Sequence, residues 1–215
     1  MTETLKIAIM GGAGSGKTSV CNRLKELGLN VISSDVLARE AVAPGTRAFN
    51  HIVRYFGQGV LKPDGTLNRP KLRQMMTKDT AARSALGRFV HPEITKLLQL
   101  KIIQAQQDGQ RFVLVEVPLL FELGIQDRFD VVVLIHAKRE RRIQRIMERD
   151  SVSKKEAEDL LDVQMPDEEK IEKSDFIIKN DGTIEQLIRS VDLFYKKVYQ
   201  KYSKKERKPL TGRKS

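Results

Sequence analysis

One eight-residue segment, Gly11-Gly12-Ala13-Gly14-Ser15-Gly16-Lys17-Thr18, constrains this chain more than any other feature. It fits the pattern of a glycine, four further residues and Gly-Lys-Ser/Thr that surrounds phosphate groups. Glycines let backbone N–H groups point inward at phosphate oxygens without interference from Cβ atoms. An apolar run precedes the segment and a helical pattern follows it, which favours the phosphate-binding interpretation over an ordinary glycine-rich turn. The loop predicts a nucleoside triphosphate ligand, but GTPases, ATPase motors and small-molecule kinases all share it.

The residue types within the loop have separate chemical tasks. Lys17 is expected to reach the β- and γ-phosphates, and the Thr18 hydroxyl is expected to bind Mg²⁺. The helix that follows adds its positive N-terminal end to the site. The predicted ATP-binding residues here are Gly12, Ala13, Gly14, Ser15, Gly16, Lys17, Thr18 and Ser19.

Short apolar runs alternate with helical patterns along the chain. Such runs are typical of buried parallel strands, so the sequence predicts an α/β fold: a P-loop NTPase core with a doubly wound five-stranded parallel sheet and helices on both faces. The predicted strands are residues 5–10, 30–33, 112–115, 131–135 and 176–178. Gly28 is expected to end the first helix, capping boxes are expected at Ser153 and Thr183, and His91-Pro92 is expected to begin a helix.

Two long helical stretches interrupt this alternation and predict the domain organisation. The expected parts are a nucleotide-binding core at 1–36, 109–137 and 172–202, two mobile helical subdomains at 37–108 and 138–171, and a basic, disordered tail at 203–215.

The net charge of +11 raises the question of a nucleic-acid partner. Residues 196–215 carry nine Lys or Arg and one Glu, which accounts for +8 and leaves +3 for the rest of the chain. Short basic tails are usually solvated, so we expect no obligate nucleic-acid partner.

Several other classes of protein do not fit the composition. The single cysteine, Cys21, cannot form an internal disulfide, no apolar run is long enough to cross a membrane, and the start lacks a secretory pattern. We therefore expect a cytoplasmic protein with no membrane partner, and a monomer. The three histidines are far apart and form no ligand spacing with Cys21, so no metal beyond Mg²⁺ is predicted.

Charged residues at strand ends and on one helix are candidates for the acceptor side of the reaction. Asp35 follows the second strand and could accept the proton of a hydroxyl group, or it could cap the helix that begins at Val36. Glu116 ends the third strand, where an acid can hold Mg²⁺ through water. Arg142, Arg145 and Arg149 share one helix face and could neutralise a phosphoryl group in transfer, or they could simply be solvated.

These motifs together resemble the dephospho-coenzyme A kinase family from about residue 5 to residue 195. The matching segments are the phosphate loop, Asp35-Val36-Leu37-Ala38-Arg39, Phe56-Gly57, Asp64-Gly65-Thr66-Leu67-Asn68-Arg69, His91-Pro92-Glu93-Ile94, Pro118-Leu119-Leu120-Phe121-Glu122, Arg145-Ile146-Met147-Glu148-Arg149-Asp150, Gln164 and Asn180-Asp181-Gly182.

The resemblance implies transfer of the ATP γ-phosphoryl group to the ribose 3′-hydroxyl of dephospho-coenzyme A, with ATP and dephospho-coenzyme A as partners and Mg²⁺ as cofactor. It implies that Asp35 is the general base, that 37–108 binds coenzyme A and that the Arg-rich helices form a lid. The residues it assigns are Asp35, Lys17 and Arg145 for catalysis, Arg149, Asn180 and Gly182 for ATP in addition to the loop, Asp35, Arg39, Arg69, His91, Pro118 and Leu119 for the acceptor, and Thr18 and Glu116 for the metal.

The chain departs from the family pattern at three positions. Ser33 stands where the family usually has an acid, Glu116 where it usually has Asp, and Arg142 where it often has Gln. Two alternatives stay open on the motifs: a nucleoside or nucleoside monophosphate kinase with the same core, and a non-catalytic nucleotide-binding module whose basic tail binds RNA.

Overall fold

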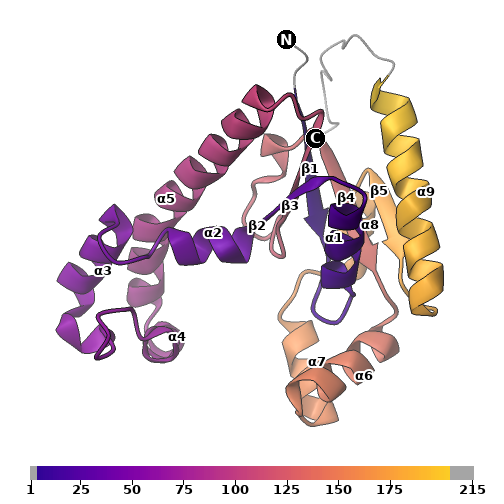
Figure 1. Cartoon of the computed structure of the whole chain (residues 1–215). Helices are drawn as coiled ribbons and strands as arrows, with labels where there is room; N and C mark the ends of the chain where they lie inside the picture. Colours follow the sequence, from indigo (N-terminus) through magenta and orange to yellow (C-terminus); the bar gives the residue numbers. More distant parts are fainter. Residues whose placement is uncertain (1–3, 204–215) are drawn as a thin grey trace. The chain divides into compact units, whose positions relative to one another are not determined.

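Residues 4–203 are described by the computed structural model, and they divide into two compact units (Figure 1). Unit 1 contains the residues up to Val31 and those from Gly109 onward, and unit 2 is Ile32–Asp108. Unit 2 thus begins before the expected boundary at residue 37, because helix α2 (Ser34–Glu40) packs on α5 (Thr80–Gln107) within it. The predicted disordered tail lies outside the described residues, except for Ser203 at the end of α9.

The expected five-stranded parallel sheet is confirmed. Its strands lie in the order β2-β3-β1-β4-β5, and β1 pairs in parallel with both β3 and β4, as β4 does with β5. Ile9 of β1 is thereby opposite Glu116 on one side and Val133 on the other. The strands are β1 (Leu5–Met10), β2 (Asn30–Ser33), β3 (Phe112–Glu116), β4 (Val131–His136) and β5 (Phe176–Lys179).

Both faces of the sheet are apolar, and this explains why its strands are continuous apolar runs. Alternate residues of β1 pack against α1 and α9, whose apolar stripes include Leu24 and Val191. Ala8 and Met10 point to the opposite face and are completely buried as well. The helices of unit 1 are α1 (Lys17–Glu26), α6 (Arg139–Asp150), α7 (Lys154–Asp162), α8 (Asp167–Glu172) and α9 (Ile184–Ser203), with a 3₁₀ turn at Gln126–Arg128.

Three predicted helix ends of unit 1 are confirmed. Gly28 follows α1 with a φ of +81°, a conformation that glycine adopts without strain. Ser153 and Glu156 form the capping box of α7. Thr183 and Gln186 exchange the same pair of hydrogen bonds at the start of α9. Local side-chain chemistry therefore determines where these helices begin and end.

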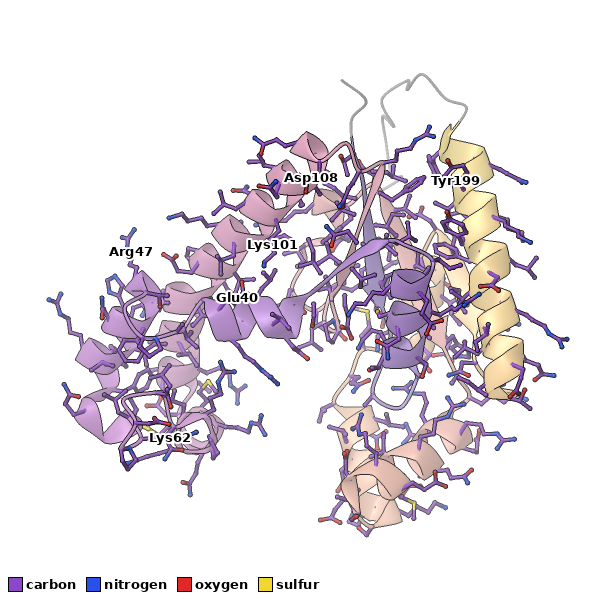
Figure 2. All side chains as sticks on the ribbon, viewed as in Figure 1. Glu40, Arg47, Lys62, Lys101, Asp108 and Tyr199 are labelled. Atoms are coloured by element: carbon purple, nitrogen blue, oxygen red, sulfur yellow. The ribbon has the colours of Figure 1, made fainter. Side chains whose placement is uncertain are left out.

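Unit 2 is a bundle of helices with its own small core. Helices α2, α3 (Arg47–Phe56) and α4 (Arg69–Lys78) all contact the long α5. The core includes Ile52, Val60, Leu67 and Leu72, which are nearly inaccessible. Glu40 of α2 faces Lys101 of α5 at 3.4 Å (Figure 2), and a 3₁₀ turn at Gln58–Val60 follows α3.

The prediction that a helix begins at His91-Pro92 is wrong. Helix α5 runs from Thr80 to Gln107 with Pro92 inside it. Its start is determined by Asp79, whose carboxylate accepts hydrogen bonds from the N–H groups of Ala81 and Ala82. Pro92 removes one backbone hydrogen bond, but packing of α5 against three other helices of unit 2 keeps the helix continuous.

Within residues 4–203, every helix is too short or too polar to span a membrane.

Candidate active site

The phosphate loop lies between β1 and α1, as its sequence predicts. Gly14 and Gly16 have φ values of +72° and +89°, which side chains with a Cβ atom rarely adopt. Any Cβ at Gly12 would overlap the guanidinium of Arg142, and one at Gly14 would lie 2.6 Å from the Arg142 carbonyl oxygen. The backbone conformation therefore favours glycine at positions 14 and 16, and the close approach of Arg142 of α6 favours it at positions 12 and 14.

Lys17 and Glu116 form an ion pair beside this loop. The Nζ atom of Lys17 donates to Oε1 of Glu116 at 2.7 Å, and their side chains are only 15% and 16% exposed. Glu116 reaches this position because β3 is the neighbour of β1, so the end of β3 is next to the start of the loop. An ammonium and a carboxylate at one sheet edge suit the binding of a phosphate and of a metal, respectively.

Arg145 and Asn180 support the loop from the other side. Arg145 donates to the carbonyl oxygens of Gly14 and Asn180 at 3.3 and 3.0 Å. Asn180 follows β5, is 6% exposed, and donates through Nδ2 to the carbonyl oxygen of Ser15 at 2.8 Å. The resemblance assigned Asn180 to ATP, and in this structure its side chain contacts the phosphate loop itself.

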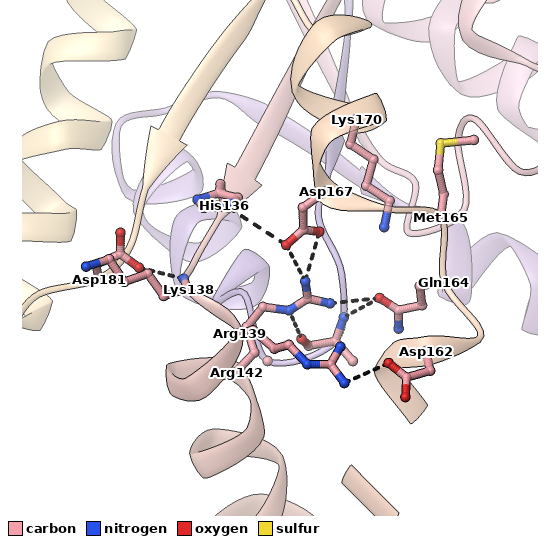
Figure 3. Close-up of polar contacts among 12 residues, drawn as sticks. His136, Lys138, Arg139, Arg142, Asp162, Gln164, Met165, Asp167, Lys170 and Asp181 are labelled. Atoms are coloured by element: carbon pink, nitrogen blue, oxygen red, sulfur yellow. Dashed lines mark hydrogen bonds and ion pairs between the residues drawn. The ribbon is translucent and has the colours of Figure 1, made fainter. Parts of the chain in front are cut away.

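Arg142 is buried between the loop and the helices that follow it (Figure 3). Its guanidinium donates to Ala13, Gln164 and Asp167, and Asp167 is also 3.8 Å from the imidazole of His136. The predicted common face of Arg142, Arg145 and Arg149 therefore has members with different surroundings. Arg149 is exposed and pairs with Asp150 at 2.6 Å, and this guanidinium lowers the pKa of that carboxyl.

Asp35 and Arg39 lie in unit 2, at the two ends of α2. The helix begins at Ser34 with Ser33 as its N-cap residue, so the interpretation of Asp35 as a helix cap is wrong. Asp35 is exposed in the first turn, and Arg39 is exposed in the last turn. The carboxylate of Asp35 is thus accessible to a ligand and is not needed to begin the helix.

Unit 2 also contains a cavity of about 220 Å³, which is lined in part by Ala38 of α2. Its lining is mostly apolar, from Ala38 of α2 and Val42 to Leu86 and Val90 of α5, and it includes Arg69 and Arg73. A cavity with an apolar lining and two cationic groups suits a ligand with an alkyl chain and phosphate groups.

The remaining predicted site residues lie on exposed or partly exposed positions. Thr18 and Ser19 are exposed in the first turn of α1, and His91 is exposed on α5. Pro118 is partly exposed and Leu119 exposed after β3, and Gly182 precedes α9.

Burial shifts the pKa of two titratable groups of unit 1. Burial raises the pKa of Cys21 to about 12, with a smaller contribution in the same direction from Glu116. Burial also lowers the pKa of Lys170, whose ammonium is 3.8 Å from Glu122. Cys21 therefore remains a thiol at neutral pH and is not a strong nucleophile.

Sequence reasoning missed the structural tasks of Arg142 and Asn180. Arg142 looks like one of many arginines on a charged helix, and no local pattern indicates that it is buried. Asn180 was singled out, but its hydrogen bond to Ser15 joins residues 165 positions apart. Only a contact map of the folded chain could have identified these contacts.

Comparison with known proteins identifies similar chains over nearly the whole length. The sequence pattern of the dephospho-CoA kinase family matches residues 5–186. A dephospho-CoA kinase of Geobacter sulfurreducens is 40% identical over 191 residues, which cover 89% of this chain and 97% of that one. A dephospho-CoA kinase domain-containing protein of Danio rerio is 39% identical over 186 residues, covering 86% of this chain and 81% of that one.

Solved structures agree with this result. The structure of TT1252 from Thermus thermophilus has a TM-score of 0.78 and 29% identity, and the match covers 91% of this chain and 98% of that one. A dephospho-CoA kinase from Campylobacter jejuni has a TM-score of 0.71 and 25% identity with the same coverage. These structures share the fold described above.

Proposed function

Because the chain belongs to the dephospho-CoA kinase family, we propose that it transfers the γ-phosphoryl group of ATP to the ribose 3′-hydroxyl of dephospho-coenzyme A. The products are ADP and coenzyme A, the last step of coenzyme A synthesis. The observation in the structure that carries this proposal is the phosphate loop with Lys17 paired to Glu116 at 2.7 Å beside it. This arrangement suits the binding of a nucleoside triphosphate, and family membership selects the acceptor.

The ATP side of the reaction is assigned to unit 1. The N–H groups of the loop and the start of α1 bind the phosphates, and Lys17 exchanges its carboxylate partner for the β- and γ-phosphates. Arg145 contacts the carbonyl oxygen of Gly14 and stabilises the charge of the phosphoryl group in transfer. Arg149 and Gly182 are assigned to ATP on the family resemblance.

Mg²⁺ is the proposed cofactor, and the residues present fit it. Such sites typically use one or two protein oxygens together with phosphates and water. Thr18 offers a hydroxyl in the exposed first turn of α1, and Glu116 offers a carboxylate at the end of β3. When bound, the ion would neutralise phosphate charge during transfer.

The acceptor side is assigned to unit 2 as a coenzyme-A-binding domain. The cavity lined by Arg69 and Arg73 offers an apolar surface for the pantetheine arm and cations for the pyrophosphate. Arg39 and His91 of unit 2, together with Pro118 and Leu119 of unit 1, are assigned to the same substrate on the family resemblance.

Asp35 is the proposed general base. Its carboxylate accepts the proton of the 3′-hydroxyl as the oxygen forms its bond to the γ-phosphorus, while the bond from that phosphorus to the ADP oxygen breaks. The carboxylate is suited to this because it is exposed and takes no part in capping α2. Catalysis then depends mainly on the position of the two substrates and on charge neutralisation.

We also propose that the enzyme acts as a monomer in the cytoplasm, with no nucleic-acid partner. The buried, unpaired thiol of Cys21 suits a reducing compartment.

The test is ADP release from Mg²⁺-ATP with dephospho-coenzyme A, adenosine and AMP as rival acceptors. We expect turnover with dephospho-coenzyme A alone. Asp35→Asn should lower kcat by about 10²-fold or more without changing ATP affinity, and Asp108→Asn, an exposed aspartate of the same unit, is the matched control. Turnover with AMP or adenosine would refute the acceptor, and near-full activity of Asp35→Asn would refute the base.

A further inference from the structure

Arg142 is buried near the start of α6, and all of its guanidinium nitrogens are engaged (Figure 3). Its Nε atom donates to the carbonyl oxygen of Ala13 at 2.9 Å. Nη1 donates to both carboxylate oxygens of Asp167 at 2.9 and 2.8 Å, and Nη2 donates to Oε1 of Gln164 at 2.9 Å. One side chain therefore joins the phosphate loop to α6 and to the segment that leads into α8.

Ala13 is held by the same group of residues on every side. Its N–H donates to Oε1 of Gln164 at 3.3 Å, and its carbonyl oxygen accepts from Arg142. Its methyl group packs against the apolar cluster shared by α6 and α7, which contains Ile143 and Leu161. Both peptide groups of Ala13 and its side chain thus depend on residues more than a hundred positions away.

The glycines beside Ala13 show how closely the loop and α6 approach one another. A Cβ atom at Gly12 would overlap Arg142 and come within 2.5 Å of Gln164 Oε1. At Gly14 a Cβ atom would collide with the backbone of Arg142. The apex of the loop therefore packs directly against Arg142, with no room for a further carbon atom at Gly12 or Gly14.

We propose that Arg142 is a positioning residue for ATP: it fixes the apex of the phosphate loop, through Ala13, to both ends of the α6–α7 hairpin. The hydrogen bonds of Arg142 to Gln164 and Asp167 anchor the end of the hairpin, where the chain returns to the sheet. The loop amides are then oriented before the nucleotide arrives.

The physical reason is preorganisation. A loop rich in glycine has many accessible backbone conformations, and fixing them on ligand binding costs conformational entropy. Charge-assisted hydrogen bonds in a site with little water are strong enough to select one conformation in advance. Each phosphate contact then costs less ordering at the moment of binding.

This inference rests on the proposed function for one point only, the identity of the nucleotide as ATP. ATP binding can be measured without any acceptor, so a failure of the acceptor assignment would leave the test intact. The readouts are the Kd of ATP by calorimetry and, where turnover is present, KM for ATP against KM for the acceptor.

The main variant is Arg142→Gln, with Arg141→Gln, an exposed neighbour on the same helix, as the matched control. We expect the Kd of ATP to rise about tenfold or more in Arg142→Gln, since several charge-assisted hydrogen bonds are lost. KM for the acceptor should stay within about twofold, as should both constants in Arg141→Gln. Arg142→Lys should not restore ATP affinity, because one ammonium cannot reproduce the fork to three partners.

Gln164→Leu keeps the test valid if Arg142→Gln does not fold. It removes the acceptor of the Ala13 N–H and should also weaken ATP binding. In combination with Arg142→Lys its effect should be less than additive, because both side chains hold Ala13 and Arg142 also donates to Gln164 directly. The proposal would be overturned if folded Arg142→Gln bound ATP within twofold of the parent, or if Arg142→Lys fully restored ATP affinity. Equal shifts in the KM values for ATP and the acceptor, or strict additivity of the two substitutions, would also overturn it.

Discussion

The ion pair between Lys17 and Glu116 predicts that removing the Glu116 carboxylate will strengthen the binding of metal-free ATP. The Lys17 ammonium is paired with the Glu116 carboxylate at 2.7 Å, and both side chains are about five-sixths buried. A charge-assisted hydrogen bond of this kind contributes about 1.5–3 kcal/mol. ATP must compete with Glu116 for Lys17, so part of the phosphate binding energy is offset by the loss of this pair.

The perturbation is Glu116→Gln, measured first in EDTA so that no metal is bound. We expect metal-free ATP to bind this variant more tightly than the parent, by up to about tenfold, because an amide competes weakly for the ammonium. The nucleotide-free variant should be less stable, with a lower melting temperature by about 2–4 °C for each kcal/mol lost. ATP should therefore raise its melting temperature more than it raises that of the parent.

With Mg²⁺ present, Glu116→Gln should instead impair the enzyme: if Glu116 holds the metal as proposed, kcat should fall by about tenfold or more. The matched control is Glu26→Gln, which removes an exposed ion pair to Arg23 at 3.0 Å and should cost less than about 1 kcal/mol. Equal or weaker binding of metal-free ATP to Glu116→Gln would refute the reasoning, because it would mean that the pair does not oppose nucleotide binding.

Two further predictions concern buried groups of unit 1. Asn180→Ala should lower the free energy of unfolding in urea by about 1–3 kcal/mol, because the carbonyl oxygen of Ser15 loses its donor at 2.8 Å. Asn180→Asp should not restore this stability, since a carboxylate cannot donate. An unchanged free energy of unfolding in Asn180→Ala would contradict the prediction. Because the pKa of Cys21 is raised to about 12, its thiol should resist iodoacetamide at pH 9, where an ordinary thiol of pKa 9.0 is half ionised, and should react once urea unfolds the chain. Rapid labelling of the native protein at that pH would show that the thiol is neither buried nor protonated.

The local features of this protein were predictable from its sequence. The phosphate loop was recognised because its glycines and its Lys-Thr pair are needed at adjacent positions, whatever the rest of the chain does. The five strands were found because both faces of the sheet are buried, which makes each strand a continuous apolar run. Capping boxes at Ser153 and Thr183 involve residues three positions apart, so they too can be read locally.

The two local predictions that failed were overruled by tertiary packing or by a competing neighbour. His91-Pro92 has the pattern of a helix start, but α5 packs against α2, α3 and α4 along its length and continues through the proline. Asp35 can cap a helix, but Ser33 takes the N-cap position two residues earlier. The preference against proline inside a helix is worth a few kcal/mol, which the tertiary contacts of α5 exceed. The preference for Asp35 as a cap is smaller, and a neighbouring serine of similar capping ability takes that position.

The phosphate loop, the parallel sheet that carries it and the motifs shared with one kinase family can all be recognised from the order of residues along the chain. The contacts of that loop cannot, because they form only in the folded chain: Glu116 with Lys17, Asn180 with Ser15, and Arg142 and Gln164 with Ala13. These partners lie 99 to 165 residues apart. Their meeting depends on the strand order β2-β3-β1-β4-β5, which brings the ends of separate strands to one edge, and no pattern of neighbouring residues encodes such a distance.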